Sequence, residues 1–264
     1  RGLGDVYKRQ ALEMDRESGI AWLGLARVQR LLGKSAEAKE TLTRARRLLP
    51  DEDPSAAAES ALLCLDNGDL EGATQHIDAA SIRGDGAIVS YVRGNIAANQ
   101  GHLKAAETHF DAAIETDPTH VRARLNRASI HMASGNAQGA LDDANVLLDL
   151  APGLALAKLR RAEANMMLSN WSDSKTDLEQ IVADAPHHHH ALTQLAACYI
   201  SMERPEKAEA PLNEALRLAP EHTDAWHQRG LLYLDWGREE AALNDFEAAV
   251  RCDGNHLDAR LHIA

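Results

Sequence analysis

The sequence is poor in aromatic side chains, in long apolar runs and in positive charge. Phe, Trp and Tyr make up 4% of its 264 residues although 45% are hydrophobic, so the core must be built mainly from small and aliphatic side chains. No apolar run approaches the roughly 18 residues of a transmembrane helix, so we predict no membrane-spanning segment here. A net charge of -12 argues against binding to nucleic acid, which needs many cationic contacts.

Cysteine pairs and catalytic motifs are also lacking. Cys64, Cys198 and Cys252 lie far apart and form no C-x-x-C pair, which indicates neither a disulfide framework nor a cysteine zinc site. The segment Gly33-Lys34-Ser35 is similar to the end of a phosphate-binding loop, but the required glycine five residues earlier is Val28. No nucleophile elbow, zinc-protease or dinucleotide motif occurs. We therefore predict no catalytic residue, no cofactor and no metal site, and hence no enzyme in this chain.

A repeat of 34 residues runs through the sequence. Five of the eight prolines stand at multiples of this period, and glycine fills the two remaining places; these residues are Pro50, Gly84, Pro118, Pro152, Pro186, Pro220 and Gly254. Seven repeats therefore cover residues 19–256, with starts at Gly19, Asp53, Ala87, Val121, Ala155, His189 and Thr223.

Each repeat contains two helical patterns around a turn at its fifteenth position. Glycine, which ends a helix at little cost, stands at that turn as Gly33, Gly101, Gly135 and Gly237. Alanine follows five residues later as Ala38, Ala106, Ala140, Ala208 and Ala242, where close helix contact would exclude a larger side chain. A larger apolar group returns four residues further on as Leu42, Phe110, Leu178, Leu212 and Phe246, which is the spacing of a helix face.

These residues resemble the W-x2-L-G-x2-Y, A-x3-F and P pattern of the tetratricopeptide repeat family. The last repeat matches through Trp226, Gly230, Tyr233, Gly237, Ala242 and Phe246, and the first through Trp22, Leu25, Ala26, Gly33, Ala38 and Pro50. The resemblance implies an all-α fold, a right-handed superhelical α-solenoid of stacked antiparallel helix pairs. It also implies a concave groove that holds an extended peptide or a partner helix.

Two departures from the pattern stand out. The second repeat fits only after a slip of one residue, to Gly68 and Ala73, so we interpret it as degenerate. Pro211 falls inside an expected helix, where it would remove a hydrogen bond, so we predict a kink there.

The ends of the sequence suggest a fragment of a longer array. Residues 1–10 break the repeat phase and resemble an adaptor-derived leader, so we exclude them from the fold. Residues 11–18 align with the tail of a preceding repeat, and residues 257–264 with the start of a further one. We therefore expect the native amino terminus to be missing, and the sequence does not distinguish the cytoplasm from the periplasm.

The resemblance places one face of each first helix in the groove. The candidate binding residues on this face are Tyr91, Asn95, Asn99, Arg122, Asn126, Arg160, Glu163, His190, Gln194 and His227, beside Arg27, Arg30, Met166 and Gln228. The alternative is an ordinary solvated helix face. The arginines at the seventh position of several repeats, namely Arg93, Arg127, Arg161 and Arg229, are expected instead to lay their stems on the packing face and extend their heads to water.

Three of these residues match positions at which some family members clamp the terminal carboxylate of a peptide. They are Arg160, Asn95 and Asn126; the two lysines of that clamp are replaced by Tyr91 and Leu156, and Arg122 is a candidate to compensate. A guanidinium forks onto a carboxylate while amides donate hydrogen bonds. We therefore expect an acidic or carboxylate-terminated segment as partner.

The four histidines at residues 187–190 would supply at most two metal ligands at a useful spacing, so we interpret them as an exposed turn.

The sequence favours a bacterial interaction scaffold that binds a protein or peptide. Two alternatives stay open: a substrate-recruiting arm of a larger glycosyltransferase or sulfotransferase, and a repeat lipoprotein of envelope export.

Overall fold

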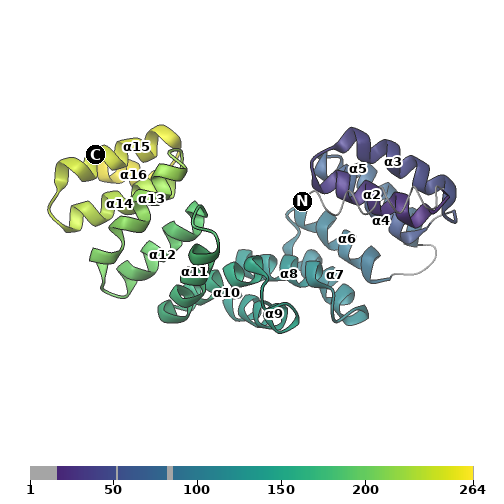
Figure 1. Ribbon diagram of the computed structural model, residues 1–264, viewed down its shortest axis with the longest axis horizontal. Coiled ribbons are helices and arrows are strands. Elements are labelled where there is room, and N and C mark those ends of the chain that lie inside the picture. The colour runs from purple at the N-terminus through teal and green to yellow at the C-terminus, as the bar shows by residue number, and fades with distance from the viewer. Residues whose placement is uncertain (1–16, 52, 82–85, 264) are drawn as a thin grey trace. The chain divides into compact units, whose positions relative to one another are not determined.

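The computed structural model describes residues 17–51, 53–81 and 86–263 (Figure 1). The described residues are mostly helical and contain no strand, which confirms the all-α prediction. None of their helices is both long and apolar enough to span a bilayer. The expected leader at residues 1–10 lies outside the described residues.

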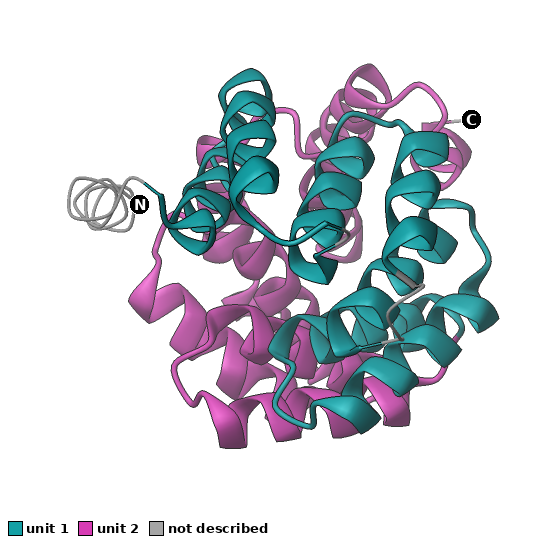
Figure 2. Ribbon diagram, turned by 90° about the vertical axis from the view of Figure 1, so that its right-hand side faces the viewer, with its two compact units in different colours: residues 1–134 teal, residues 135–264 magenta. Residues whose placement is uncertain are grey.

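The chain divides into two compact units, residues 1–134 and 135–264, coloured separately in Figure 2. The first unit contains α2 (Gly19–Leu31), α3 (Ser35–Leu48), α4 (Pro54–Asp66), α5 (Leu70–Ser81), α6 (Ala87–Asn99), α7 (Leu103–Thr116) and α8 (Val121–Ala133). The second contains α9 (Ala137–Leu150), α10 (Ala155–Met167), α11 (Trp171–Asp184), α12 (His189–Ser201), the 3-10 helix η1 (Pro205–Lys207), α13 (Glu209–Leu218), α14 (Thr223–Asp235), α15 (Glu239–Cys252) and α16 (Leu257–Ile263). The division falls at the turn inside the fourth repeat.

Within each compact unit, consecutive helices pack in pairs, and several first helices also contact the next first helix. The pairs are α2 with α3, α4 with α5 and α6 with α7 in the first unit, and α10 with α11, α12 with α13 and α14 with α15 in the second. The short turns between paired helices make them antiparallel neighbours. As a result, the first helices α2, α4, α6 and α8 form one row, and α12 and α14 are adjacent in another.

The helix pairs are held at close range by side chains of matched size. Where the eighth residue of a repeat is glycine, the partner sixteen residues later is phenylalanine, as in Gly94 with Phe110 and Gly230 with Phe246. In three repeats it is alanine and the partner is leucine; these pairs are Ala26 with Leu42, Ala162 with Leu178 and Ala196 with Leu212. All ten of these residues except the glycines are at most 5% exposed, so the two phenylalanine rings fill space that the glycines leave. The fourth repeat departs from this matching, because Ala128 and Ala144 occupy its two positions.

The turn between paired helices requires a left-handed residue in every repeat. Gly33, Gly68, Gly101, Gly135 and Gly237 have φ between 69° and 77°. Gly68 lies one place late because α4 begins at Pro54 after its cap Asp53, which accounts for the slip in the second repeat. Ser169 and Glu203 hold the same conformation at φ 60° and 59° without being glycine.

The expected kink at Pro211 is wrong. Residues 205–207 form η1, and α13 begins only at Glu209, so Pro211 lies in the first turn of that helix. A backbone N–H there would have no partner within the helix, which removes the usual penalty of proline. The sixth repeat therefore shortens its second helix to 10 residues.

The size matching predicts a compensating pair of mutations. A Cβ on residue 230 would lie 2.6 Å from Phe246 Cε1, so Gly230→Ala should lower the free energy of unfolding by about 1–3 kcal/mol. Adding Phe246→Leu should recover most of that loss, because the double variant has the Ala and Leu pair of other repeats. Urea unfolding of both single variants and the double variant measures the coupling, and strictly additive effects would contradict the size matching.

The left-handed turn predicts a stabilising mutation. Ser169→Gly should raise the free energy of unfolding by about 0.5–1 kcal/mol, because the strain of a side chain at positive φ exceeds the added entropy of glycine in the unfolded chain. Ser134→Gly is the matched control, since Ser134 caps α8 with an ordinary φ of -90°. Thermal melting should rank Ser169→Gly above the wild type and Ser134→Gly below it; the reverse order would refute the strain argument.

Candidate peptide-binding surface

We call the row of groove-facing positions on the first helices the inner face, and its part in the first compact unit holds a pocket of about 310 Å³. The pocket is lined from α2, α4, α6 and α8 by Arg30, Leu31, Leu62, Leu65, Asp66, Tyr91, Asn95, Asn99 and Arg122. The structure therefore brings Tyr91, Asn95, Asn99 and Arg122 of the candidate set together.

Three asparagines form a connected group beside this pocket. Asn126 Nδ2 donates to Asn95 Oδ1 at 2.6 Å, and Asn99 Nδ2 donates to the Asn95 carbonyl oxygen at 2.9 Å. The oxygen of the Asn95 side chain is thus satisfied, while its Nδ2 donates no hydrogen bond to the described residues. Asn95 is consequently fixed with its amide hydrogens available to a ligand.

Tyr91 forms part of the core as well as the pocket wall. Its ring lies 6.2 Å from the Phe110 ring and 5.0 Å from the His120 ring, and the residue is 7% exposed. Tyr91 therefore forms a rigid wall of the pocket and offers little surface to a ligand.

Most of the charge near the pocket is already paired. Glu59, 2% exposed, accepts from Arg27 Nε at 3.0 Å and from Arg30 Nε at 2.6 Å, while Arg30 Nη1 donates to Asp66 at 2.8 Å. Burial opposes the charge of Arg30, but the hydrogen bonds and charges of Glu59 and Asp66 outweigh it and raise its pKa. This cluster joins α2 to α4 and leaves no unpaired cation on either helix's inner face.

Arg122 differs from these arginines. It lies half-buried at the start of α8, and it has no hydrogen-bonded or ion-paired partner in the part of the chain that the structure describes. Its guanidinium is therefore the group in this pocket that is available to an anion.

Arg160 of the second compact unit is occupied. Its Nη1 donates to Glu163 at 2.6 Å, and the other oxygen of Glu163 accepts from Gln194 Nε2 at 3.3 Å and lies 3.6 Å from His190 Nε2. Burial alone would raise the pKa of Glu163, but hydrogen bonds from His190 and Arg160 hold it below its ordinary value. The structure thus groups Arg160, Glu163, His190 and Gln194, and Glu163 neutralises the arginine that the sequence suggested for carboxylate binding.

His227, the last candidate, belongs to a group of aromatic rings. It lies 4.8 Å from the His256 ring and 5.8 Å from the Phe246 ring. Burial and the nearby His256 and His262 lower its pKa, so the neutral ring is favoured.

No cluster of three or more His, Cys, Asp or Glu side chains suited to a metal ion occurs among the described residues.

The arginines at the seventh position connect neighbouring helices. Arg229 donates to both carboxylate oxygens of Asp245 at 2.7 and 2.8 Å and to Asn213 at 2.7 Å. Arg161 bonds Asp177 in the same two-pronged way and reaches Asn145 at 3.5 Å. For Arg161 and Arg229 the expectation that the heads extend to water is wrong, because each guanidinium is held by a nearly buried aspartate.

Histidines that cap helices are the feature that the sequence interpretation missed. Nδ1 of His120, His188 and His256 accepts a backbone N–H at 3.1 Å at the start of α8, α12 and α16, and His222 takes the same place before α14. The signal was present, because these four residues are spaced by multiples of 34. His188 is therefore a helix cap within the tract at residues 187–190.

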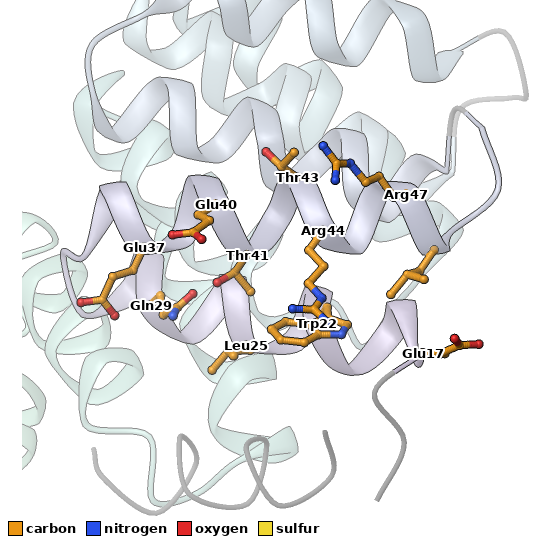
Figure 3. Close-up of a pocket in the computed structure, with 11 residues that line it drawn as sticks. Glu17, Trp22, Leu25, Gln29, Glu37, Glu40, Thr41, Thr43, Arg44 and Arg47 are labelled. Carbon is orange, nitrogen blue, oxygen red and sulfur yellow. The ribbon is translucent and has the colours of Figure 1, made fainter. Parts of the chain in front are cut away.

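A larger hollow of about 1120 Å³ adjoins α2 and α3 (Figure 3). Arg44 lies over the Trp22 ring there, 4.3 Å from its centroid. Leu25 in this lining stands at the seventh position of its repeat. In the fifth repeat the seventh residue is Arg161, which contacts Asn145 on the preceding helix α9. We therefore do not count this hollow as part of the inner face.

Comparison with known families agrees with this architecture. Sequence profiles described as tetratricopeptide repeat match residues 195–261 in one version and residues 5–52, 91–155 and 159–223 in another. The matches cover most of the chain, so it belongs to the tetratricopeptide repeat family. No curated protein matches the sequence significantly.

Several solved structures share the fold. A tetratricopeptide repeat protein from Parabacteroides merdae is 18% identical, with 93% of this chain and 97% of that chain covered and a TM-score of 0.63. Cut9-Hcn1, an APC/C hetero-tetramer, is 15% identical over 86% of this chain and 45% of that one, with a TM-score of 0.71. YrrB, described as having an unusual peptide-binding site, is 18% identical over 70% and 96%, with a TM-score of 0.56.

The histidine caps predict a loss of stability in acid. Burial, with a smaller contribution from Arg122, lowers the pKa of His120 below the ordinary histidine value of about 6.5, while Asp117 opposes the shift. The neutral ring is thus favoured in the folded state, so its stabilisation is complete above about pH 6.5 and decreases as the pH falls below that value.

Asparagine can cap a helix without titrating, so His120→Asn should reduce the fall in the urea midpoint between pH 7.5 and pH 5.5. His102→Asn is the control, since His102 precedes α7 without a side-chain cap bond. An unchanged pH dependence in His120→Asn would contradict the role of the cap.

Proposed function

We propose that the protein is a non-catalytic interaction scaffold whose inner face binds a peptide segment, with an acidic or carboxylate-terminated residue held in the pocket of the first compact unit. Membership of the tetratricopeptide repeat family supports a role in protein interaction in general. The observation that supports the finer proposal is Arg122, an arginine without a partner among the described residues, which lines the same pocket as Asn95.

The pocket chemistry suits a carboxylate. Arg122 supplies two parallel N–H donors, and Asn95 Nδ2 supplies neutral donors from a side chain that Asn126 holds in place. Asp66, the acid in the lining, is paired with Arg30 and so opposes an incoming anion less than a free carboxylate would. Leu62 and Leu65 give the pocket an apolar wall for the aliphatic part of the peptide.

Arg160 is not needed for this proposal. Its bond to Glu163 leaves that region of the second compact unit electrically balanced. We therefore assign the anion contact to Arg122, with Asn95, Asn99 and Asn126 as the polar support, and expect Arg160→Ala to affect an acidic peptide less than Arg122→Ala does.

A fluorescent 12-residue Gly-Ser peptide ending in two aspartates provides the test, with either a free or an amidated carboxyl end. Fluorescence anisotropy should show the free peptide binding at least about tenfold more tightly than the amidated one. Arg122→Glu should abolish that difference, because it reverses the charge that faces the carboxylate.

Arg124→Glu is the matched control, since it makes the same charge change on α8 at an arginine that donates to the Pro118 carbonyl. If free and amidated peptides bound equally and Arg122→Glu changed neither, the carboxylate proposal would be refuted. Binding that weakened equally in both arginine variants would indicate non-specific attraction instead.

A further inference from the structure

A second pocket lies on the inner face of the second compact unit, between α12 and α14. Its volume is about 690 Å³, and Ala197, Ile200 and Leu231 contribute apolar side chains to it. Ile200 and Leu231 remain 36% and 37% exposed, although both are large aliphatic residues. Burying such side chains against a partner would be favourable, because apolar surface would leave water.

The turn of the sixth repeat closes one side of this pocket. Glu203 takes the left-handed conformation, and its N–H bonds the Ile200 carbonyl at 3.0 Å. Pro205 then starts η1 in place of a regular α-helical turn, and both Glu203 and Pro205 line the pocket. The unusual start of the second helix in this repeat therefore shapes the wall.

A buried acceptor in the pocket lacks a donor. Gln228 Oε1 is shielded from solvent and has no hydrogen-bond partner among the described residues. Leaving such an atom unsatisfied costs about 1–3 kcal/mol, and an N–H donor from a bound peptide would remove that cost. Because the oxygen is shielded, the Gln228 side chain must turn into the pocket that it lines to accept this bond, and a ligand that donates hydrogen bonds would favour that turn.

The charges around the pocket are negative. Glu203 and Asp235 line it, both are exposed, and neither has an ion pair in the described part of the chain. No lysine or arginine is among its described lining residues. This pocket therefore has the opposite preference to the Arg122 pocket and favours a cation beside the apolar group.

We propose that this pocket binds an extended peptide segment carrying a large apolar side chain next to a lysine or arginine. The apolar side chain lies against Ile200 and Leu231, a peptide N–H donates to Gln228, and the cation pairs with Glu203 or Asp235. The inference rests on the proposed groove-binding function and assigns a second partner chemistry to it.

The probe is a fluorescent, amidated 12-residue Gly-Ser peptide with a central Leu-Lys, compared with versions carrying Gly-Lys or Leu-Glu. Anisotropy at low salt should give at least about tenfold tighter binding of the Leu-Lys peptide than of either variant, and weaker binding as salt is raised. Leu231→Asp, and separately the double variant Glu203→Lys with Asp235→Lys, should each remove that preference. Ile200→Gln provides a second variant that removes an apolar side chain from the pocket wall. Circular dichroism checks that each variant is folded.

The peptide with the free carboxyl end, measured beside the Leu-Lys peptide, separates this inference from the proposed function. If the carboxylate peptide bound through Arg122 while the Leu-Lys peptide did not bind, this inference would fail and the proposed function would stand. If neither peptide bound, both would fail. Sedimentation that showed a dimer broken by Leu231→Asp, without Leu-Lys binding, would assign the pocket to a second copy of the chain and overturn the proposal.

Discussion

The close contact between paired helices is the constraint on which the rest of the structure depends. In five of the repeats a glycine or an alanine faces a phenylalanine or a leucine sixteen residues later, and the larger side chain stands opposite the glycine. Because this contact sets how near the second helix lies, it also fixes how the first helices present their free face. The positions of Asn95 and Arg122 in one pocket, and of Ile200 and Leu231 in the other, follow from it.

The sequence predicts the fold well because its determinants are periodic. Glycine at the turn, alanine at the crowded contact and an apolar residue one turn later recur in phase, and each can be identified without knowing what it touches. The slip in the second repeat was visible for the same reason. Pro211 was misjudged because the expected start of the helix assumed a regular α-helical turn, whereas the chain forms η1 first.

The candidate site is less predictable. Whether a polar side chain on the inner face is available to a ligand depends on its partners within the protein, and the repeat pattern does not reveal those partners. Arg160 and Arg122 occupy comparable faces, yet Glu163 neutralises the first and no described residue pairs with the second. The histidine caps are hard to predict, because histidine is an unusual cap and only the 34-residue spacing of His120, His188, His222 and His256 marks them. The unsatisfied oxygen of Gln228 depends on atomic packing and has no signature in the sequence.

The two-sided contacts of Arg161 and Arg229 have a consequence for the order of the repeats. Each arginine binds an aspartate of its own helix pair and also an asparagine of the preceding pair. The contact inside a helix pair would survive if repeats were exchanged, but the contact between pairs would survive only if the new neighbour also offered an amide or carboxylate there. Exchanging repeats would therefore keep this junction where the preceding repeat offers Asp111, Asn145 or Asn213, and would lose it where the first repeat, which has Thr43 at that position, came before Arg161 or Arg229.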